Sequence, residues 1–365
     1  MKPYSALYYV KENKGRSLLI AVMFFLTTLL LLGGNYIRSN YYYWEGIIDF
    51  TERAIEVEAS VNDQDEEFRD YFALVDKLSN DPDLTVMLHS GYAEPSMDWT
   101  CTMGFTMGGY AARFNTAEDM REAFRIVGYH GDFSNLKNGS LAISKAMANN
   151  KGLKLGDIVD ESMGLMGTYT LDALIDEDTY AVFYVEEYPK DKLTRAHVLS
   201  ETLSYSELME RVKTLCEGTQ CKIQKSWRDD LNAQFEPINL IFYLALILLS
   251  LVLAVSVNSV ISGHYNKRTY EFGIYRAIGR TKRDVRRKVA AEIAITDIVS
   301  VVVGLGFVEL LTFMMNELYY KPGGRFLPYW SEIGVVGLIV SNICVLVPTI
   351  LLRGRAMCKA DVTEF

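Results

Sequence analysis

The chain has 365 residues, of which 50% are hydrophobic, and a formal net charge of −9. Its hydrophobic residues are concentrated in long runs, which excludes an ordinary soluble domain. The acidic balance argues against a protein that binds nucleic acid through bulk charge.

Four apolar runs are long enough to cross a bilayer, which takes roughly 20 residues. The first, second and fourth contain no charged residue, whereas the third contains Glu292, Asp297 and Glu309. A buried soluble helix is the alternative for each run, and the charges make it strongest for the third. We therefore expect transmembrane helices at residues 17–36, 238–262, 289–315 and 333–352.

The first run raises the question of a cleaved signal peptide. It follows the basic residues Lys11, Lys14 and Arg16. Its apolar core is longer than the roughly 7–15 residues of a signal-peptide core. The stretch GGNYIRSNYYYW that ends it also lacks a small-x-small cleavage site. We therefore expect a retained anchor.

Basic residues indicate which segments face the cytoplasm. They dominate the predicted N-terminus (1–16), the loop 263–288 and the tail 353–365. The loop carries nine of them, opposed only by Glu271 and Asp284. The sequence therefore predicts a multi-pass protein with both termini cytoplasmic, residues 37–237 outside and a short external loop at 316–332.

The external segment, residues 37–237, contains 36 acidic and 19 basic residues and so carries a charge near −17. Such a surface suits a cationic ligand or divalent ions, but solubility is the more ordinary reason for it. Helical and strand patterns alternate along the segment. Residues 140–159 predict a strand, a helix, a turn and a second strand, and residues 167–187 predict two strands. Ser204 and Glu207 predict a capping box at the start of a helix. The predicted fold is thus an α-helical membrane protein with four transmembrane helices and a large α+β extracytoplasmic domain, carried on helical stalks, inserted between helices 1 and 2.

Cys216 and Cys221 flank the tetrapeptide EGTQ in the external segment. An oxidising compartment would favour a disulfide between them. Cys101 is then the odd external cysteine. Cys344 lies in the fourth span and Cys358 in the cytoplasmic tail, where we expect inert thiols.

Motifs for catalysis or cofactor binding are missing from the sequence. His89, His130 and His197 are isolated and show no zinc-ligand spacing. Neither a Gly-x-Ser-x-Gly nor a Gly-x-x-x-x-Gly-Lys-Ser/Thr stretch occurs. We therefore predict no catalytic residue, no metal site and no cofactor bound by this chain.

The loop between the second and third spans predicts a rigid elbow. Tyr270, Ile274 and Ile278 recur at helical spacing, Gly279 can end the helix, and Thr281 with Asp284 forms a capping box for the next helix. The plain alternative is a positively charged inner loop whose aromatic residues rest on lipid. Two capping signals within three residues favour a docking surface for a cytoplasmic partner.

Residues 238–365 resemble the permease domain of FtsX-like and MacB-like ABC transporters. The likeness rests on Tyr-Glu-Phe-Gly-Ile-Tyr-Arg-Ala-Ile-Gly at 270–279, then Glu292 and a glycine-containing span with Gly304 and Gly306. The stretch ISKAMANNKGLKLGDIV resembles the family's periplasmic core, and Ala360-Asp361-Val362 loosely resembles its tail. The residues that match the family's loop pattern are Arg268, Glu271, Gly273, Ile274, Arg276, Ala277, Ile278 and Gly279.

The resemblance implies a membrane subunit in the bacterial cell membrane that works with a separate cytoplasmic ABC ATPase. ATP and magnesium would bind to that partner, and a second permease chain would complete a dimer. The function would be export or extraction of a peptide, lipid-linked or drug-like substrate, or else activation of an external partner such as a cell-wall hydrolase. A membrane receptor or sensor is the rival from another class. The implied coupling residues are Tyr270, Glu271, Phe272, Ile274, Tyr275, Arg276, Ile278 and Gly279.

Acidic residues within the third span are candidates for function. We expect Glu292, near the inner interface, to pair with the surrounding basic residues. Asp297 lies deeper by about 7–8 Å, and a helix–helix contact or a proton- or substrate-linked role would account for it. Ser300 and Gly304 allow close helix packing, within the chain or across a dimer.

Overall fold

The computed structural model describes residues 14–59, 65–91, 97–104, 106–165, 167–224 and 227–359. The chain divides into two compact units, which we call the helical unit and the α+β unit. The helical unit comprises Met1–Arg38, Glu236–Met315 and Leu327–Phe365, and the α+β unit comprises Ser39–Phe235 and Asn316–Phe326. Most of the predicted N-terminus and the stretch Ala360-Asp361-Val362 lie outside the described residues.

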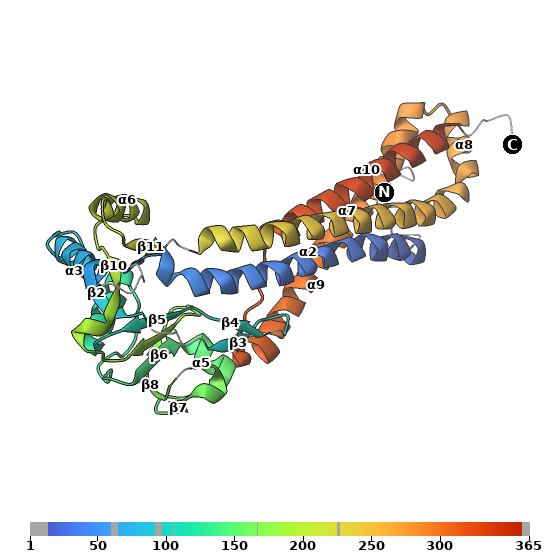
Figure 1. Cartoon of the computed structure of the whole chain (residues 1–365). Helices are drawn as coiled ribbons and strands as arrows, with labels where there is room; N and C mark the ends of the chain where they lie inside the picture. The colour runs from blue at the N-terminus through green and yellow to red at the C-terminus, as the bar shows by residue number, and fades with distance from the viewer. Residues whose placement is uncertain are drawn as a thin grey trace. The chain divides into compact units, whose positions relative to one another are not determined.

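Long helices dominate the helical unit (Figure 1). Four of the described helices are long and apolar enough to cross a membrane, by length and composition. Each contains one of the predicted runs. α2 continues past Tyr36 and α7 begins well before residue 238, so both expected stalk segments are helical. The helices are α2 (Lys14–Ile48), α7 (Arg228–Asn266), α8 (Thr269–Ala277), α9 (Lys282–Met315) and α10 (Glu332–Lys359).

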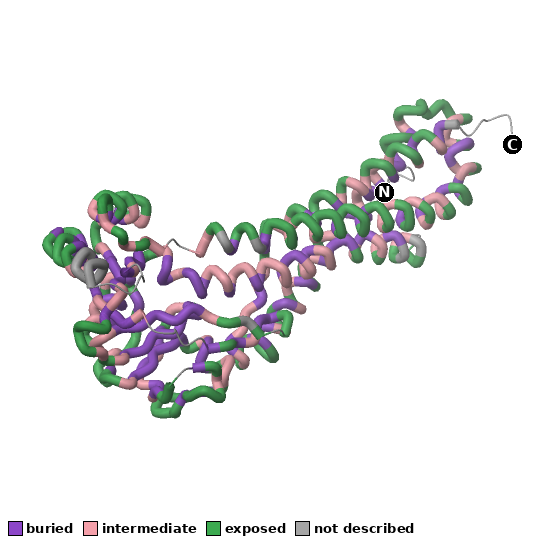
Figure 2. The backbone as a smooth tube through the Cα atoms, viewed as in Figure 1, coloured by how far each residue is buried: buried purple, intermediate pink, exposed green. Residues whose placement is uncertain are grey.

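Small residues let these helices pack closely. A Cβ atom on Gly34 of α2 would lie 2.3 Å from the Cα of Gly334 on α10, and one on Gly304 of α9 would lie 2.4 Å from Thr28 Oγ1 of α2. The contact predicted around Gly304 is therefore made within the chain. Many residues of α7 and α9 are exposed (Figure 2) and apolar, which would suit a lipid environment.

One end of the helical unit gathers the segments that were predicted to be cytoplasmic. Phe24 of α2 and Phe272 of α8 belong to one buried apolar cluster. At the end of α10, the carbonyl of Cys358 accepts a hydrogen bond from Arg276 Nη1 at 3.4 Å, and Cys358 Sγ donates to the Lys282 carbonyl at 3.3 Å. The start of α2, the elbow and the end of α10 therefore share one end of the helical unit, and the side of the membrane that this end faces stays a prediction.

In the α+β unit, the first sheet is antiparallel, with strand order β11-β1-β10-β2. Apolar side chains of α3 and α6 pack on it, among them Leu74 and Leu208. The capping box predicted at Ser204 and Glu207 is present at the start of α6. The elements are β1 (Ile55–Glu58), α3 (Asp65–Ser79), β2 (Thr85–Ser90), β10 (Leu193–Leu199), α6 (Tyr205–Cys216) and β11 (Lys222–Gln224).

The second sheet is mixed, with strand order β5-β9-β6-β8-β7. Residues 140–159 form the predicted strand, helix, turn and strand, with Gly152 at the turn in the left-handed conformation. The two strands predicted within 167–187 are present, but both pair with β6 and not with each other. The elements are β5 (Ala111–Phe114), α4 (Ala117–Val127), β6 (Ser140–Ser144), α5 (Lys145–Lys151), β7 (Ile158–Val159), β8 (Tyr169–Ile175) and β9 (Val182–Val185).

Shorter elements complete the α+β unit. The hairpin of β3 and β4 forms a separate two-stranded sheet. Residues predicted as a short external loop begin with the π-helical turn η4 and continue into η5. The bounds are η1 (Phe50–Glu52), β3 (Asp98–Thr100), β4 (Thr106–Gly108), η2 (Glu161–Met163), η3 (Lys190–Lys192), η4 (Asn316–Tyr320) and η5 (Lys321–Gly323).

A pair of stacked histidines is buried in the α+β unit. The rings of His89 and His197 lie with centroids 4.1 Å apart, on strands β2 and β10. Burial, followed by repulsion from Arg195, lowers the pKa of His197 to about 4. Burial and the neighbouring His197 lower the pKa of His89. The other charged groups around the pair are Glu56, 3.8 Å from His89 Nε2, and the buried Arg113.

Acidification should therefore destabilise the α+β unit. Below pH about 6.5 the unfolded chain protonates both histidines, whereas folded His197 stays neutral down to about pH 4. The unfolded state then binds more protons, so the free energy of unfolding falls as the pH drops through this window, by about 3 kcal/mol for His197 alone. Urea unfolding of the full chain in detergent at several pH values measures the slope. His197→Phe should reduce the dependence of the unfolding free energy on pH. His130→Gln, which replaces an exposed histidine, should leave that dependence unchanged. Equal slopes for all three proteins would contradict the prediction.

Cys216 ends α6 and Cys221 precedes β11, and both contribute to one apolar cluster. Both are present as thiols in the structure. Burial, with a smaller effect of Cys221, raises the pKa of Cys216 to about 11. The disulfide between them stays a prediction.

Alkylation of the protein from an oxidising compartment tests that disulfide. With the bond formed, Cys216 and Cys221 should be modified in the unfolded protein only after reduction. Cys101, which is also buried, serves as the control and should be modified equally in both cases. Equal modification of Cys216 and Cys221 with and without reductant would remove the disulfide.

Candidate functional site

The elbow between α8 and α9 is formed by two adjacent caps. Gly279 follows α8 with φ +89°, a conformation that disfavours any residue with a side chain. Its N–H donates to the Arg276 carbonyl at 3.0 Å, and the Arg280 N–H donates to the Tyr275 carbonyl at 3.0 Å. These bonds satisfy two of the free carbonyls at the end of α8.

The second cap starts α9. The Asp284 N–H donates to Thr281 Oγ1 at 3.2 Å, and the Thr281 N–H donates to Asp284 Oδ2 at 3.1 Å. This is the reciprocal capping box predicted from the sequence. Because both caps lie within a few residues, the direction of the chain changes at a defined point between two helices.

One face of α8 is apolar and exposed. Tyr270 is 62% exposed, Ile274 45% and Ile278 70%. We call these three side chains the apolar triad. On the opposite face Phe272 and Gly273 are buried. The buried face holds α8 in place, and the triad lies on its exposed face.

The remaining predicted coupling residues anchor α8. Arg268 Nε lies 2.8 Å from Glu271 Oε2, and Tyr275 donates its hydroxyl to Glu271 Oε1 at 3.0 Å. Burial raises the pKa of the Glu271 carboxyl, but the hydrogen bond and charge of Arg268 outweigh that effect and hold the pKa below its ordinary value. Together with the Arg276 bond to α10, these contacts fix α8 against its neighbours.

A buried ion network ties the elbow to α9. Glu292 is 3% exposed and Arg268 is 4% exposed. Arg268 Nη1 lies 2.7 Å from Glu292 Oε2, and Lys288 Nζ lies 3.4 Å from Glu292 Oε1. The Tyr265 hydroxyl also donates to Glu292 Oε2 at 3.0 Å. Glu292 thus pairs with basic residues, as expected, and links the segment before α8 to the first turns of α9.

The sequence did not indicate the roles of Arg268 and Lys288 in this network. Lys288 lies four residues before Glu292, a spacing at which opposite charges on a helix meet. This spacing could have identified Lys288 as a partner of Glu292. Arg268 is 24 residues away from Glu292. Its guanidinium also lies over the Phe272 ring, 4.9 Å from the centroid.

Asp297 lies deeper in α9 and is not part of this network. It is buried, and its Oδ1 has no hydrogen-bond partner among the described residues. It lines a groove between α9 and α10 that also includes Asn342. One carboxylate oxygen of Glu309 likewise lacks a partner within the described part of the chain.

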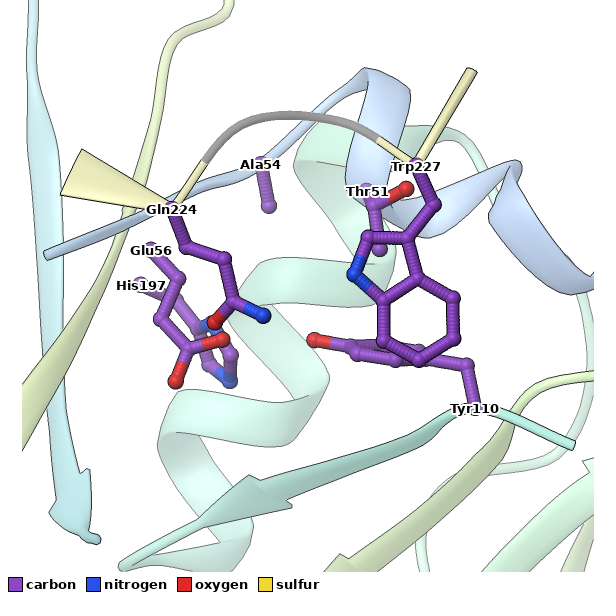
Figure 3. Close-up of a pocket in the computed structure, with 7 residues that line it drawn as sticks. All are labelled: Thr51, Ala54, Glu56, Tyr110, His197, Gln224 and Trp227. Atoms are coloured by element: carbon purple, nitrogen blue, oxygen red, sulfur yellow. The ribbon is translucent and has the colours of Figure 1, made fainter. Parts of the chain in front are cut away.

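The α+β unit contains a small polar pocket next to the buried histidines (Figure 3). Its volume of about 10 Å³ suits a single water molecule, and it is too small for a substrate. No group of three or more His, Cys, Asp and Glu residues within the described ranges could hold a metal ion. The pocket is lined by Thr51, Ala54, Glu56, Tyr110, His197, Gln224 and Trp227.

The elbow lies inside a region that matches a known family. Residues 243–356 match the family model described as FtsX-like permease C-terminal. The C-terminal part of the chain is thus similar to an FtsX-like permease domain. FtsX-like permeases are membrane components of ABC systems and work with separate ABC ATPases. The match covers α8, α9 and nearly all of α10, while a comparison with curated proteins found no match.

Proposed function

We propose that the chain is the permease subunit of an ABC transporter, and that the apolar triad of α8 rests on a separate cytoplasmic ATPase. The observation that carries this proposal is the exposure of Tyr270, Ile274 and Ile278 on a capped elbow inside the FtsX-like region. Burying an isoleucine side chain contributes about 1.5–3 kcal/mol, so the triad offers a strong contact. ATP and magnesium bind to the partner, because this chain has no phosphate-binding loop.

In this proposal the elbow faces the cytoplasm and the α+β unit lies outside. Nine basic residues in 263–288 favour that orientation in a bacterial cell membrane. A second permease chain pairs with this one, and closure of the ATPases moves the α+β unit. The output is export or extraction of a peptide, lipid-linked or drug-like substrate.

The second candidate function is mechanical activation of an external partner, such as a cell-wall hydrolase. The pocket in Figure 3 has room for about one water molecule, so it gives no support to export over this candidate. In both cases the same elbow would transmit the motion of the ATPase.

Purification of the full chain tests the shared part of the proposal. A chain with a C-terminal tag, extracted from its own cells in mild detergent, should retain a subunit with a Gly-x-x-x-x-Gly-Lys-Ser/Thr motif, and the complex should hydrolyse ATP. A chain that never retains such a subunit would contradict it. Pull-down through residues 37–237 then separates the outputs, because only the activator should retain an external enzyme.

A further inference from the structure

The segment between α9 and α10 belongs to the α+β unit. Asn316–Phe326 forms one compact unit with Ser39–Phe235, whereas Met315 before it and Leu327 after it belong to the helical unit. The chain therefore passes between the units at the two ends of this segment, in addition to the crossings through α2 and α7. We call Asn316–Phe326 the tether.

The backbone of the tether at Gly324 packs closely against the backbone of α5. Gly324 adopts φ +59°, and a Cβ atom there would lie 1.8 Å from the Ala146 carbonyl oxygen. That oxygen is main chain, so no side-chain rotation could relieve the clash. Asn150 Nδ2, also on α5, donates to the Gly323 carbonyl at 3.0 Å and to the Thr100 carbonyl at 2.8 Å. Asn150 thus joins the tether to the β3–β4 hairpin.

Buried aromatic residues hold the end of the tether. The Phe326 N–H donates to the Tyr43 hydroxyl at 2.7 Å, and the Tyr180 hydroxyl donates to the Gly324 carbonyl at 3.4 Å. Tyr43, Tyr180 and Trp99 are almost completely buried and pack with ring centroids 4.7–5.0 Å apart. Asn316, Tyr320 and Gly324 of the tether are buried, while residues 317–319 and 321–322 are exposed. The tether is therefore anchored to its unit at a few buried points.

A single helix, α9, connects the elbow to the tether. α9 spans 34 residues from Lys282 to Met315, a length of about 51 Å at 1.5 Å per residue. It contains no proline, whereas α7 carries Pro237 beside the boundary of the two units, where a proline removes one helical hydrogen bond. The Arg268–Glu292 pair fixes the segment before α8 to α9. The start of α8 is thus tied to α9 by a buried ion pair.

We propose that α9 and the tether carry the motion of the elbow to α5 and the β3–β4 hairpin, as a connection distinct from the α2 and α7 stalks, with Gly324 and Asn150 as positioning residues. This inference rests on the proposed function, since the motion comes from the ATPase. It adds the route by which that motion reaches the α+β unit.

Hydrogen exchange on the full chain bound to its ATPase, with and without ATP, tests the route. In the wild-type protein, ATP should change the exchange of α8, α5 and the tether. Gly324→Ala should increase tether exchange without ATP and abolish the ATP response of α5, while the response of α8 persists. Gly152→Ala is the matched control, because Gly152 has φ +70° and open space around its Cβ position; it should keep the α5 response.

A second variant tests the same route in case Gly324→Ala does not fold. Asn150→Ala removes the bond to Gly323 without backbone strain and should also lose the α5 response. If α5 responds to ATP in Asn150→Ala as in the wild-type protein, although tether exchange has risen, the route is overturned. If ATP changes nothing at α8 in the wild-type complex, the proposed function is overturned, and this inference with it.

Discussion

Ile274→Asp and Ile278→Asp should each weaken binding of the ATPase subunit about a hundredfold or more. Each substitution removes an apolar contact worth about 1.5–3 kcal/mol and places a charge where the partner buries an apolar surface. Both side chains are exposed in the chain alone, so its own stability should hardly change. Co-purification, and titration of the purified ATPase onto the permease, measure the loss.

Ile158→Asp is the matched control for these variants. Ile158 is an equally exposed isoleucine, but it lies on the edge strand β7 of the α+β unit. It should leave ATPase binding unchanged. Wild-type affinity in both Ile274→Asp and Ile278→Asp would show that the triad is not the docking surface.

Glu292→Gln should destabilise the elbow by about 3–5 kcal/mol, the cost of breaking a buried ion pair. The substitution leaves the charges of Arg268 and Lys288 buried without the carboxylate that they share. Amide exchange across residues 265–280 should rise steeply, and the thermal unfolding temperature in detergent should fall. Stimulation of ATP hydrolysis by the permease should fall as well, because α8 would no longer be fixed to α9.

Glu122→Gln provides the comparison, since Glu122 pairs with Arg125 on the surface of the α+β unit. Exposed pairs contribute about 0–1 kcal/mol, so this variant should behave like the wild-type protein. If Glu292→Gln were as stable as Glu122→Gln and exchanged no faster at the elbow, the buried network would not hold α8.

Local signals made the elbow predictable. The turn at Gly279 that follows α8 and the cap at Thr281 that precedes α9 each depend on hydrogen bonds between residues at most five positions apart. The exposure of the triad followed from its spacing, because Phe272 lies on the other side of the same helix. The sequence left open which of the eight predicted coupling residues are exposed and which anchor the helix.

The sheets show the opposite case. The strands β8 and β9 were recognisable from their composition, but both pair with β6. Their order depends on long-range pairing, which a local pattern does not encode. The stacking of His89 on His197 also depends on long-range pairing. The two histidines are far apart in the sequence but lie on β2 and β10, which are adjacent strands of the first sheet.

The sequence by itself determined the four apolar spans, their charge asymmetry, the capped elbow and the lack of a phosphate-binding loop. Hydropathy, charge and capping act over short stretches of chain, so they can be read without knowing the fold. Only the tertiary structure decided the partners of Glu292 and the place of the tether, because Arg268 lies 24 residues from Glu292 and Asn150 lies 173 residues from Gly323. Contacts at such separations form only when the folded chain brings both residues together.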